Sequence, residues 1–280
     1  PVNSVFHHHA HAAAVVGEFS RKLTDEYNHK DTNWLVFTWD GVGLGENGNL
    51  WGGEALLGRP GHWQHCGSLR PFRLTGGDKV SREPWRSALA LCWESGHDWE
   101  YITEEIALLQ QAWQQNINTL TSSAAGRLFD AAAALIGINT VSSFEGQAPM
   151  LLETLATSQQ TEHDMIELAV IEDQAGIWRI DWAPLLPMLM NNSRSQAARA
   201  YCFHLSLAQA LVTQASRIRE QQGEFIIGLS GGVFQNRLLC ELVIPLLERE
   251  QFQVYLPQQI PVNDAGLCYG QIIETIASDN

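Results

Sequence analysis

The chain has 280 residues, which is somewhat long for one domain and short for two. Apolar residues make up 45% of it and ten residues are tryptophan, so a disordered chain is excluded. The formal net charge of −14 disfavours nucleic acid and anionic membrane surfaces as partners, because both need a basic face.

Cysteine usage indicates a reducing compartment, and we expect a cytoplasmic protein. The five cysteines stand at positions 66, 92, 202, 240 and 268 without a C-x-x-C pair, which disfavours a disulfide framework or a structural zinc site. No apolar run approaches the roughly 20 residues of a membrane span. The chain starts at Pro1 without Met or a signal peptide, so we interpret it as part of a longer protein.

The first 60 residues predict a helix followed by a strand hairpin. Residues 7–19 are rich in Ala and free of helix breakers. Residues 34–39 form a short apolar run, predicted as a buried strand that enters a turn at Asp40-Gly41. Asn47-Gly48-Asn49 marks a hairpin, with residues 50–57 as the return strand.

The middle of the chain has a mostly helical pattern. Residues 59–79 are expected to be loop-rich, and Pro84 suits the first turn of a helix. A loop is expected at 142–147, followed by a helix to 155, and an edge strand at 178–182. Further helices are expected at 104–120, 124–136 and 195–221.

The last section alternates strands and helices. Strands are predicted at 225–229 and 252–256, and helices at 236–250 and 265–277. A glycine turn at 230–233 joins the first strand to its helix. This alternation predicts a βαβ unit and an α/β fold with a mixed sheet.

Four histidines lie between positions 7 and 11, namely His7, His8, His9 and His11. In a helix His7 and His11 share one face, a spacing that lets two imidazoles reach one divalent ion, whereas His8 and His9 point about 100° and 200° away. The alternative is a solvated or hydrogen-bonded histidine cluster. Two imidazoles leave coordination positions open, so a metal site here needs a further ligand, most simply a carboxylate.

Two glycine turns each follow a predicted strand. At 40–45 (DGVGLG) the glycines permit close approach of the backbone to phosphates, and Asp40 is suited to hold a metal or a metal-bound water. At 228–233 (GLSGGV) the turn opens a helix whose free N–H groups would face a nucleotide, with Asn236 one turn further. Ordinary turns are the alternative for each. Together with the histidine pair, the turns favour a nucleotide- and metal-binding site.

Asp264 follows the last predicted strand and precedes the last predicted helix. An Asp in this place is suited to cap the helix. It is also suited to be the missing carboxylate ligand of the histidine pair, and both interpretations stay open.

Taken together these residues resemble the actin-like ATPase superfamily, in its branch of carbamoyl- and threonylcarbamoyl-transferring enzymes. Within that branch the chain is most similar to the HypF family of [NiFe]-hydrogenase maturation carbamoyltransferases. The motifs that carry this resemblance occur in family order over almost the whole chain. They are HHHAH at 7–11, TWDGVG at 38–43, GGE at 52–54, LRPF at 69–72, GGDK at 76–79, GRLFDA at 126–131, FEGQA at 144–148, GGVFQN at 231–236 and NDAG at 263–266.

The resemblance implies which residues form the site. His7, His11 and Asp264 would bind one divalent metal and act in catalysis, and this ligand set suits Zn²⁺ or Fe²⁺ better than Mg²⁺. ATP or carbamoyl adenylate would be bound on its phosphate side by Asp40, Gly41 and Gly43. Its adenosine side would be bound by Gly231, Gly232 and Asn236. Its ribose would be bound by Asp130, Glu145 and Gly146.

The resemblance also implies the reaction. HypF-type enzymes make carbamoyl adenylate from carbamoyl phosphate and ATP in another domain of the same polypeptide. The domain similar to this chain then moves the carbamoyl group to the C-terminal cysteine thiol of HypE, on the way to the cyanide ligands of the hydrogenase iron. A bound metal would act as a Lewis acid. The partner supplies the thiolate, so this chain needs no nucleophilic cysteine.

The implied fold is α/β, of the actin-like ATPase type (ASKHA, ribonuclease H-like), with a mixed sheet. Residues 1–280 would form the C-terminal carbamoyltransferase domain, with a mostly helical insertion at about 59–200. The first lobe of that fold would be incomplete in this sequence, and we find no acylphosphatase-like, zinc-finger-like or adenylate-forming segment. We therefore expect a C-terminal fragment of a longer enzyme.

Three rival functions remain. A tRNA threonylcarbamoyladenosine enzyme shares the metal and nucleotide motifs, but the −14 charge and the FEGQ segment at 144–147 argue against it. An O-carbamoyltransferase acting on a small-molecule hydroxyl is the second. The third is an actin-like regulatory ATPase, which the His7 and His11 pair disfavours, because such proteins need only Mg²⁺ and phosphates.

Overall fold

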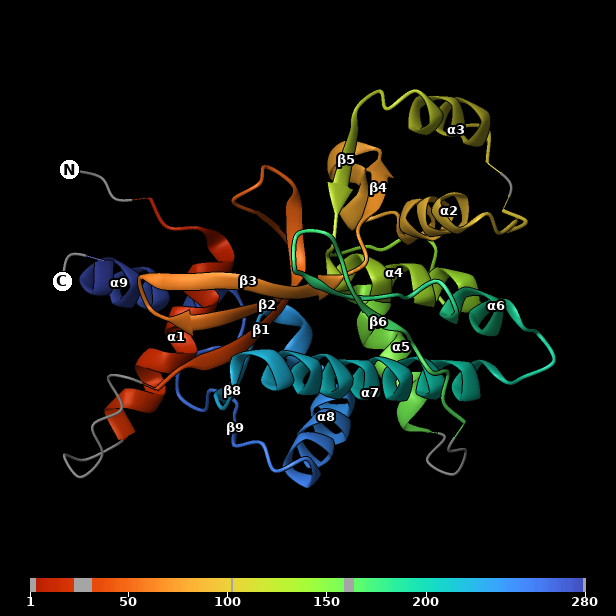
Figure 1. Cartoon of the computed structure of the whole chain (residues 1–280). Coiled ribbons are helices and arrows are strands. Elements are labelled where there is room, and N and C mark those ends of the chain that lie inside the picture. Colours follow the sequence, from red (N-terminus) through yellow and green to blue (C-terminus); the bar gives the residue numbers. More distant parts are fainter. Residues whose placement is uncertain (1–3, 23–31, 102, 159–163, 279–280) are drawn as a thin grey trace.

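A mixed sheet of nine strands runs through the part of the chain that the computed structural model describes, residues 4–22, 32–101, 103–158 and 164–278 (Figure 1). The strand order is β6-β7-β3-β2-β1-β8-β9, with β5 pairing both β2 and β4. Neighbours are antiparallel in some pairs (β1 with β2) and parallel in others (β1 with β8). The predicted α/β class with a mixed sheet is confirmed.

The strands are longest at the centre of the sheet, where β1 has 11 residues and β2 has 10, whereas β9 at one edge has two. Their bounds are β1 Trp34–Leu44, β2 Leu50–Arg59, β3 His62–Leu69, β4 Phe72–Thr75, β5 Thr119–Ser122, β6 Val170–Glu172, β7 Trp178–Ile180, β8 Ile226–Ser230 and β9 Val254–Tyr255.

Helices cover both faces of the sheet, with α1 and α9 packed together on one side and α4, α7 and α8 on the other (Figure 1). The α-helices are α1 His7–Lys22, α2 Pro84–Ser95, α3 Ile106–Gln114, α4 Ala125–Ile136, α5 Gln147–Thr157, α6 Leu185–Met190, α7 Gln196–Gln222, α8 Arg237–Arg249 and α9 Leu267–Ser278. Short 3₁₀ turns are η2 Gly77–Ser81, η3 Gly232–Gln235 and η4 Asp264–Gly266.

The first half of strand β1 is apolar except for Thr38, and both of its faces are buried. Trp34 and Val36 point to α1, where they pack in a cluster with Val15 of that helix. Phe37 and Trp39 point the other way, into the larger core beneath α4, α7 and α8. The period-2 alternation of the strand therefore joins two cores across one sheet.

The hairpin predicted at Asn47-Gly48-Asn49 is confirmed, but β1 is longer than predicted. We expected a turn at Asp40-Gly41, but β1 continues to Leu44, and its pairing with β2 shifts register between Trp39 and Gly43. The turn follows at 45–49, with Gly48 at φ 77°. Glycines at 41 and 43 favoured the wrong prediction. In a strand they accompany a bulge, which bends the strand at Asp40 and re-aims its side chain.

Two segments of the middle region were assigned wrongly. Residues 59–79 are not loop-rich, because β3 and β4 lie there, and Pro60-Gly61 is the turn between β2 and β3. The polar β3 sequence, HWQHCGSL, gave no apolar alternation to detect. The helix expected at 104–120 ends at Gln114, Asn116 and Asn118 adopt positive φ, and β5 follows.

The C-terminal α/β series is confirmed. β8, α8 and β9 form a βαβ unit, with β8 parallel to both β1 and β9. The strand near Trp178 also exists, but β7 lies between β6 and β3 and is not the edge strand that we expected. Among the described residues, no helix combines the length and apolar character needed to cross a membrane.

Glu54 on β2 is a carboxylate with no exposed surface. The N–H groups of Gly52 and Gly53 donate to its Oε2 at 2.5 and 2.7 Å, and the hydroxyls of Ser68 and Ser123 donate to its Oε1. Burial raises the pKa of Glu54 to about 7, although these four donors favour the charged form. The side chain ties β2 to β3 and to the connection between β5 and α4.

This buried carboxyl group predicts a pH dependence of stability. Between pH 4.5, the ordinary pKa, and about 7, the folded chain keeps a proton that the unfolded chain releases. The free energy of unfolding should therefore fall as the pH rises through this window. Glu54→Gln is neutral at every pH, so its unfolding free energy should fall less steeply across this window. Urea unfolding at several pH values measures this, and Glu167→Gln on the surface should behave as wild type. Equal slopes for Glu54→Gln and wild type would contradict the assignment.

Candidate functional site

Helix α1 places two histidines side by side. The rings of His7 and His11 have their centroids 4.8 Å apart, as expected for residues one turn apart on one face. The His11 side chain is 2% exposed and that of His7 is 21% exposed, so the pair is open on the His7 side. The neighbouring Ala10, Ala12 and Ala13 are fully buried and let the helix lie close to the sheet.

Two carboxylates complete the group. Asp40 at the β1 bulge places Oδ2 2.7 Å from Nε2 of His7 and 3.2 Å from Nε2 of His11. Asp264 in η4 places Oδ1 3.5 and 3.3 Å from the same two nitrogens. One ligand atom from each of the four side chains lies within 4.8 Å of the others. The structure therefore brings His7, His11 and Asp264 together. It adds Asp40, for which the sequence suggested both a metal-holding role and a place on the phosphate side.

The side chain of Asn263 caps the η4 turn that leads into α9, because its Oδ1 accepts the N–H of Ala265 at 3.2 Å. The Asp264 carboxylate is left free of the helix and turns toward the histidine pair. Of the two interpretations left open for Asp264, the structure places its side chain where the ligand interpretation needs it.

The charges in the group stabilise one another. Burial disfavours the charged form of His11, but hydrogen bonds to Asp264 and Asp40 outweigh it and raise the His11 pKa. Burial would also raise the pKa of Asp40, yet its hydrogen bonds to His11 and His7 hold that pKa well below its usual range. Burial lowers the pKa of His8 strongly. The His8 ring lies between the rings of His7 and Trp51, with centroid distances of 5.1 and 6.0 Å.

The four side chains fit a divalent cation. Two imidazole nitrogens and two carboxylates are ordinary ligands of Zn²⁺ and Fe²⁺, whereas Mg²⁺ prefers an all-oxygen set. Two carboxylates within 4.8 Å of each other also repel unless a positive charge lies between them. Which metal binds stays a prediction.

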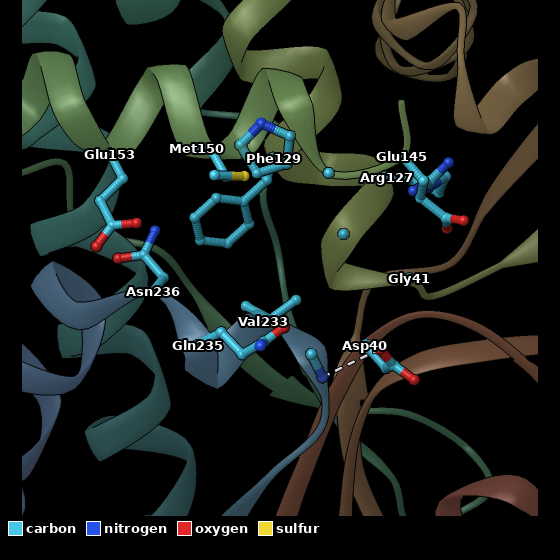
Figure 2. A pocket seen from close by; sticks show the side chains of 14 residues that line it. Asp40, Gly41, Arg127, Phe129, Glu145, Met150, Glu153, Val233, Gln235 and Asn236 are labelled. Atoms are coloured by element: carbon cyan, nitrogen blue, oxygen red, sulfur yellow. Dashed lines mark hydrogen bonds between the residues drawn. The ribbon is translucent and has the colours of Figure 1, made fainter. Parts of the chain in front are cut away.

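A cavity of about 420 Å³ opens beside this group, and Asp40 lines both (Figure 2). Its walls come from the β1 bulge, the start of α4, the start of α5 and the η3 turn. The lining residues are Asp40, Gly41, Gly126, Arg127, Phe129, Glu145, Gly146, Pro149, Met150, Glu153, Gly232, Val233, Gln235 and Asn236. Six of the residues predicted to bind the nucleotide are among them, namely Asp40, Gly41, Glu145, Gly146, Gly232 and Asn236.

The three other predicted residues, Gly43, Gly231 and Asp130, do not line the cavity. A side chain at Gly43 would meet the His7 ring, so this glycine lets β1 pack on the histidine helix. Gly231 has φ 98° and packs on the carbonyl oxygen of Trp39, which fixes the turn after β8. Both glycines thus allow close backbone packing next to the site without lining the cavity themselves.

Asp130 lies behind the cavity wall, 1% exposed, with Oδ2 3.0 Å from Nη2 of Arg127. Burial raises its pKa to about 7, against the lowering effect of Arg127. It is thus placed to hold Arg127, which itself lines the cavity. Sequence reasoning had quoted Arg127 only as part of a motif. The sequence did contain an indication of its importance: Arg127 falls in the first turn of an Ala-rich apolar helix. A charged side chain is rarely buried in such a helix unless it is paired or binds a ligand.

The N-terminus of α8 is not free, in contrast to our expectation. Glu153 accepts the N–H groups of Arg237 and Leu238 at 2.7 and 3.3 Å, and Oδ1 of Asn236 accepts that of Leu239 at 2.8 Å. The side chains of Glu153 and Asn236 lie together at one end of the cavity, opposite Asp40 (Figure 2). Sequence reasoning missed Glu153 because its partners lie more than 80 positions away.

Asn236 is held on its other side by His204, a fully buried residue of α7. His204 Nδ1 lies 2.8 Å from the carbonyl oxygen of Ala200, to which it must donate. Its Nε2 therefore accepts from the Asn236 amide at 2.9 Å. Burial lowers the His204 pKa to about 4, which keeps the ring neutral and the acceptor available.

Comparison with known proteins agrees with this architecture. Residues 36–271 match the family model described as "Carbamoyltransferase, Kae1-like Domain, second subdomain". The carbamoyltransferase HypF of Rhodobacter capsulatus is 36% identical over 282 residues, covering 99% of this chain and 36% of that protein. HypF of Synechocystis sp. is 33% identical over 301 residues, covering 99% and 37%. The chain thus spans little more than a third of the length of these relatives.

A solved structure, full-length HypF in its phosphate- and nucleotide-bound form, superposes with a TM-score of 0.86 at 28% identity. That match covers 100% of this chain and 36% of the other. The class defined here is an α/β domain of the Kae1-like carbamoyltransferase type. The chain belongs to the HypF carbamoyltransferase family.

The pairing of His204 with Asn236 predicts a loss of stability when it is broken. His204→Phe keeps the ring volume but leaves a buried Asn236 N–H without an acceptor, which should lower the free energy of unfolding by about 1–3 kcal/mol. Urea unfolding measures the change. His62→Phe, at an exposed position, is the control and should stay close to wild type. Equal stability of the two variants would show that the hydrogen bond is not formed.

Proposed function

We propose that this chain transfers a carbamoyl group from carbamoyl adenylate to the C-terminal cysteine thiol of HypE, in the biosynthesis of the cyanide ligands of [NiFe]-hydrogenase. The observation that carries the proposal is the shared position of Asp40, which contacts both histidines and also lines a cavity of about 420 Å³. That volume lies in the ordinary range for small-molecule sites. Family membership supports carbamoyl transfer over the rival reactions.

The cavity is the proposed binding site of ATP or carbamoyl adenylate. Asn236 and Gly232 would bind the adenosine side, Asp40 and Gly41 the phosphate side, and Glu145 with Gly146 the ribose. Arg127 suits an anionic phosphate, because its side chain is 7% exposed and its Nε has no hydrogen-bond partner among the described residues. One solved relative is described as phosphate- and nucleotide-bound, which supports this assignment.

His7, His11, Asp40 and Asp264 are the residues proposed to hold a divalent metal, Zn²⁺ or Fe²⁺. When bound, such an ion supplies Lewis-acid stabilisation of a negatively charged oxygen. The protein's own contribution is orientation. The β1 bulge and the N–H of Gly232, which donates to Asp40 Oδ1 at 3.1 Å, fix the Asp40 carboxylate relative to the cavity (Figure 2).

The transfer step needs an external nucleophile. The thiolate of the partner protein would attack the carbamoyl carbon, a C–S bond would form, and the bond from that carbon to the phosphate oxygen would break with AMP as the leaving group. Burial raises the pKa of Cys66, Cys92 and Cys240 to about 11 to 12, so these thiols are poor nucleophiles. This supports a thiol from the partner.

The finer fold and domain assignments are part of the proposal. We infer an actin-like ATPase (ASKHA, ribonuclease H-like) fold for residues 1–280, with the inserted region at about 59–200. Strand β3 lies within that region and pairs with β2 of the main sheet, so the insertion would begin after it. The carbamoyl-adenylate-forming domain would belong to the same polypeptide, and the enzyme would be cytoplasmic.

The metal ligands should be needed for transfer and not for adenylate formation. His7→Ala and His11→Ala in the full-length enzyme should retain pyrophosphate release and lose the mass increase on HypE. Loss of one imidazole should also weaken metal binding severely. Intact mass spectrometry of HypE beside a pyrophosphate assay measures both. His62→Ala, an exposed histidine outside the group, is the control. Normal HypE modification by a folded, metal-free double variant would sink the proposal.

Gly232→Asp should weaken nucleotide binding at the cavity. A side chain there would lie 2.9 Å from Asp40 Oδ1 and would add a second negative charge facing the phosphates. Isothermal titration with ATP should show affinity reduced by at least about tenfold, equivalent to roughly 1.4 kcal/mol. Ser193→Asp adds the same charge at an exposed site and should bind as wild type. Unchanged affinity of Gly232→Asp would exclude this turn from the nucleotide site.

A further inference from the structure

Glu18 of α1 is a buried carboxylate that takes no part in the group or the cavity described above. It is 2% exposed. It follows His11 by seven residues, which is nearly two helical turns, so it lies on the same face of α1 as His11. The histidine face of the helix therefore continues, two turns later, into a negatively charged residue.

The carboxylate of Glu18 accepts hydrogen bonds from one short segment, residues 255–260. Its Oε1 accepts the hydroxyl of Tyr255 at 2.8 Å and the N–H of Gln258 at 2.9 Å. Gln259 N–H is shared between its two oxygens at 3.2 and 3.1 Å, and Oε2 accepts the N–H of Ile260 at 2.7 Å. Burial opposes the charged form, but the backbone N–H groups outweigh it and lower the Glu18 pKa to about 2.

The segment that Glu18 holds leads directly to Asp264. Three residues separate Ile260 from Asp264. Among them, Val262 accepts the N–H of Gly231 on its carbonyl oxygen at 2.8 Å. The Asp264 side chain is 69% exposed, and its ion pairs are with His7 and His11. Apart from these two ion pairs, the position of the Asp264 carboxylate depends on the path of the backbone that carries it.

We infer that Glu18 is a positioning residue, which anchors residues 258–260 to α1 and so sets the distance between Asp264 and the His7 and His11 pair. The same helix then carries two metal ligands and the anchor of a third. This inference rests on the proposed function, since it takes the four side chains as a metal site. The chemistry is specific to a carboxylate, because only a group with two acceptor oxygens can receive four donors of this kind.

The other attachment of this region is the packing of α9 on α1. A side chain at Gly270 would lie 1.8 Å from the Ala10 carbonyl oxygen, so the two helices touch at their backbones. Glu274 offers a matched control on α9. It is also a buried carboxylate, 6% exposed. Its polar partners lie elsewhere: it accepts the indole N–H of Trp63 at 3.0 Å and the backbone N–H of Gly61.

The test compares Glu18→Gln with Glu274→Gln. Gln presents an amide N–H₂ where one carboxylate oxygen accepted backbone N–H groups, so segment 258–260 should detach from α1. Zn²⁺ or Fe²⁺ affinity is measured by competition with a chelator. Only the metal that wild type binds and the His7→Ala, His11→Ala double variant does not bind is counted as bound at the site. Glu18→Gln should bind about 10- to 100-fold more weakly, the usual effect of a supporting residue, and Glu274→Gln as wild type.

A second measurement keeps the inference testable without metal. Hydrogen exchange on metal-free protein should show loss of protection in Glu18→Gln at the amides of residues 258–266, with α1 and α8 still protected. Unchanged metal affinity together with unchanged exchange would overturn the inference, and so would equal weakening in Glu274→Gln. If wild type binds no metal at the histidines, the metal site itself fails, and the exchange result alone decides the role of Glu18.

Discussion

The arrangement of the site depends on the two oxygens of Asp40. One oxygen faces the imidazoles of His7 and His11, and the other accepts the N–H of Gly232. A single carboxylate thus joins helix α1, the bulge of β1 and the turn after β8, three segments with no local reason to meet. Because the same side chain lines the cavity, any movement of the histidines changes one wall of the cavity as well. The geometries of the proposed metal and nucleotide sites therefore both depend on the position of Asp40.

Buried carboxylates support this arrangement with different charges. Glu18 receives three backbone N–H groups and a hydroxyl, and its pKa falls to about 2. Glu54 also receives four donors, but it lies fully buried within the sheet, and burial raises its pKa to about 7. The balance between burial and donors decides the sign in each case. Glu18 therefore keeps its charge beside the segment that leads to Asp264, whereas burial favours the protonated form of Glu54 within the sheet.

The parts that the sequence predicted are those encoded locally. The His7 and His11 spacing, the hairpin and the βαβ unit at the C-terminus are each visible within about 30 residues, and the structure contains them. Strand β3 was missed because its sequence is polar and its stability comes from pairing with β2. The contact of Asp40 with both histidines was not predicted, because it depends on a bulge in β1 that glycines permit but do not encode. Glu153 and Glu18 act on segments far along the chain, and no local pattern reveals such partners.

The order of the site residues along the chain has a consequence for synthesis. His7, His11 and Asp40 leave the ribosome first, whereas Gly232 and Asp264 come last, and the intervening residues build the cavity floor on α4 and α5. Contacts between the two ends of a chain must wait for closure of a long loop. A nascent chain that stops before the final strand can fold its histidine helix but cannot close the site. Only a chain synthesised to the end of this domain could therefore bind the metal and the nucleotide.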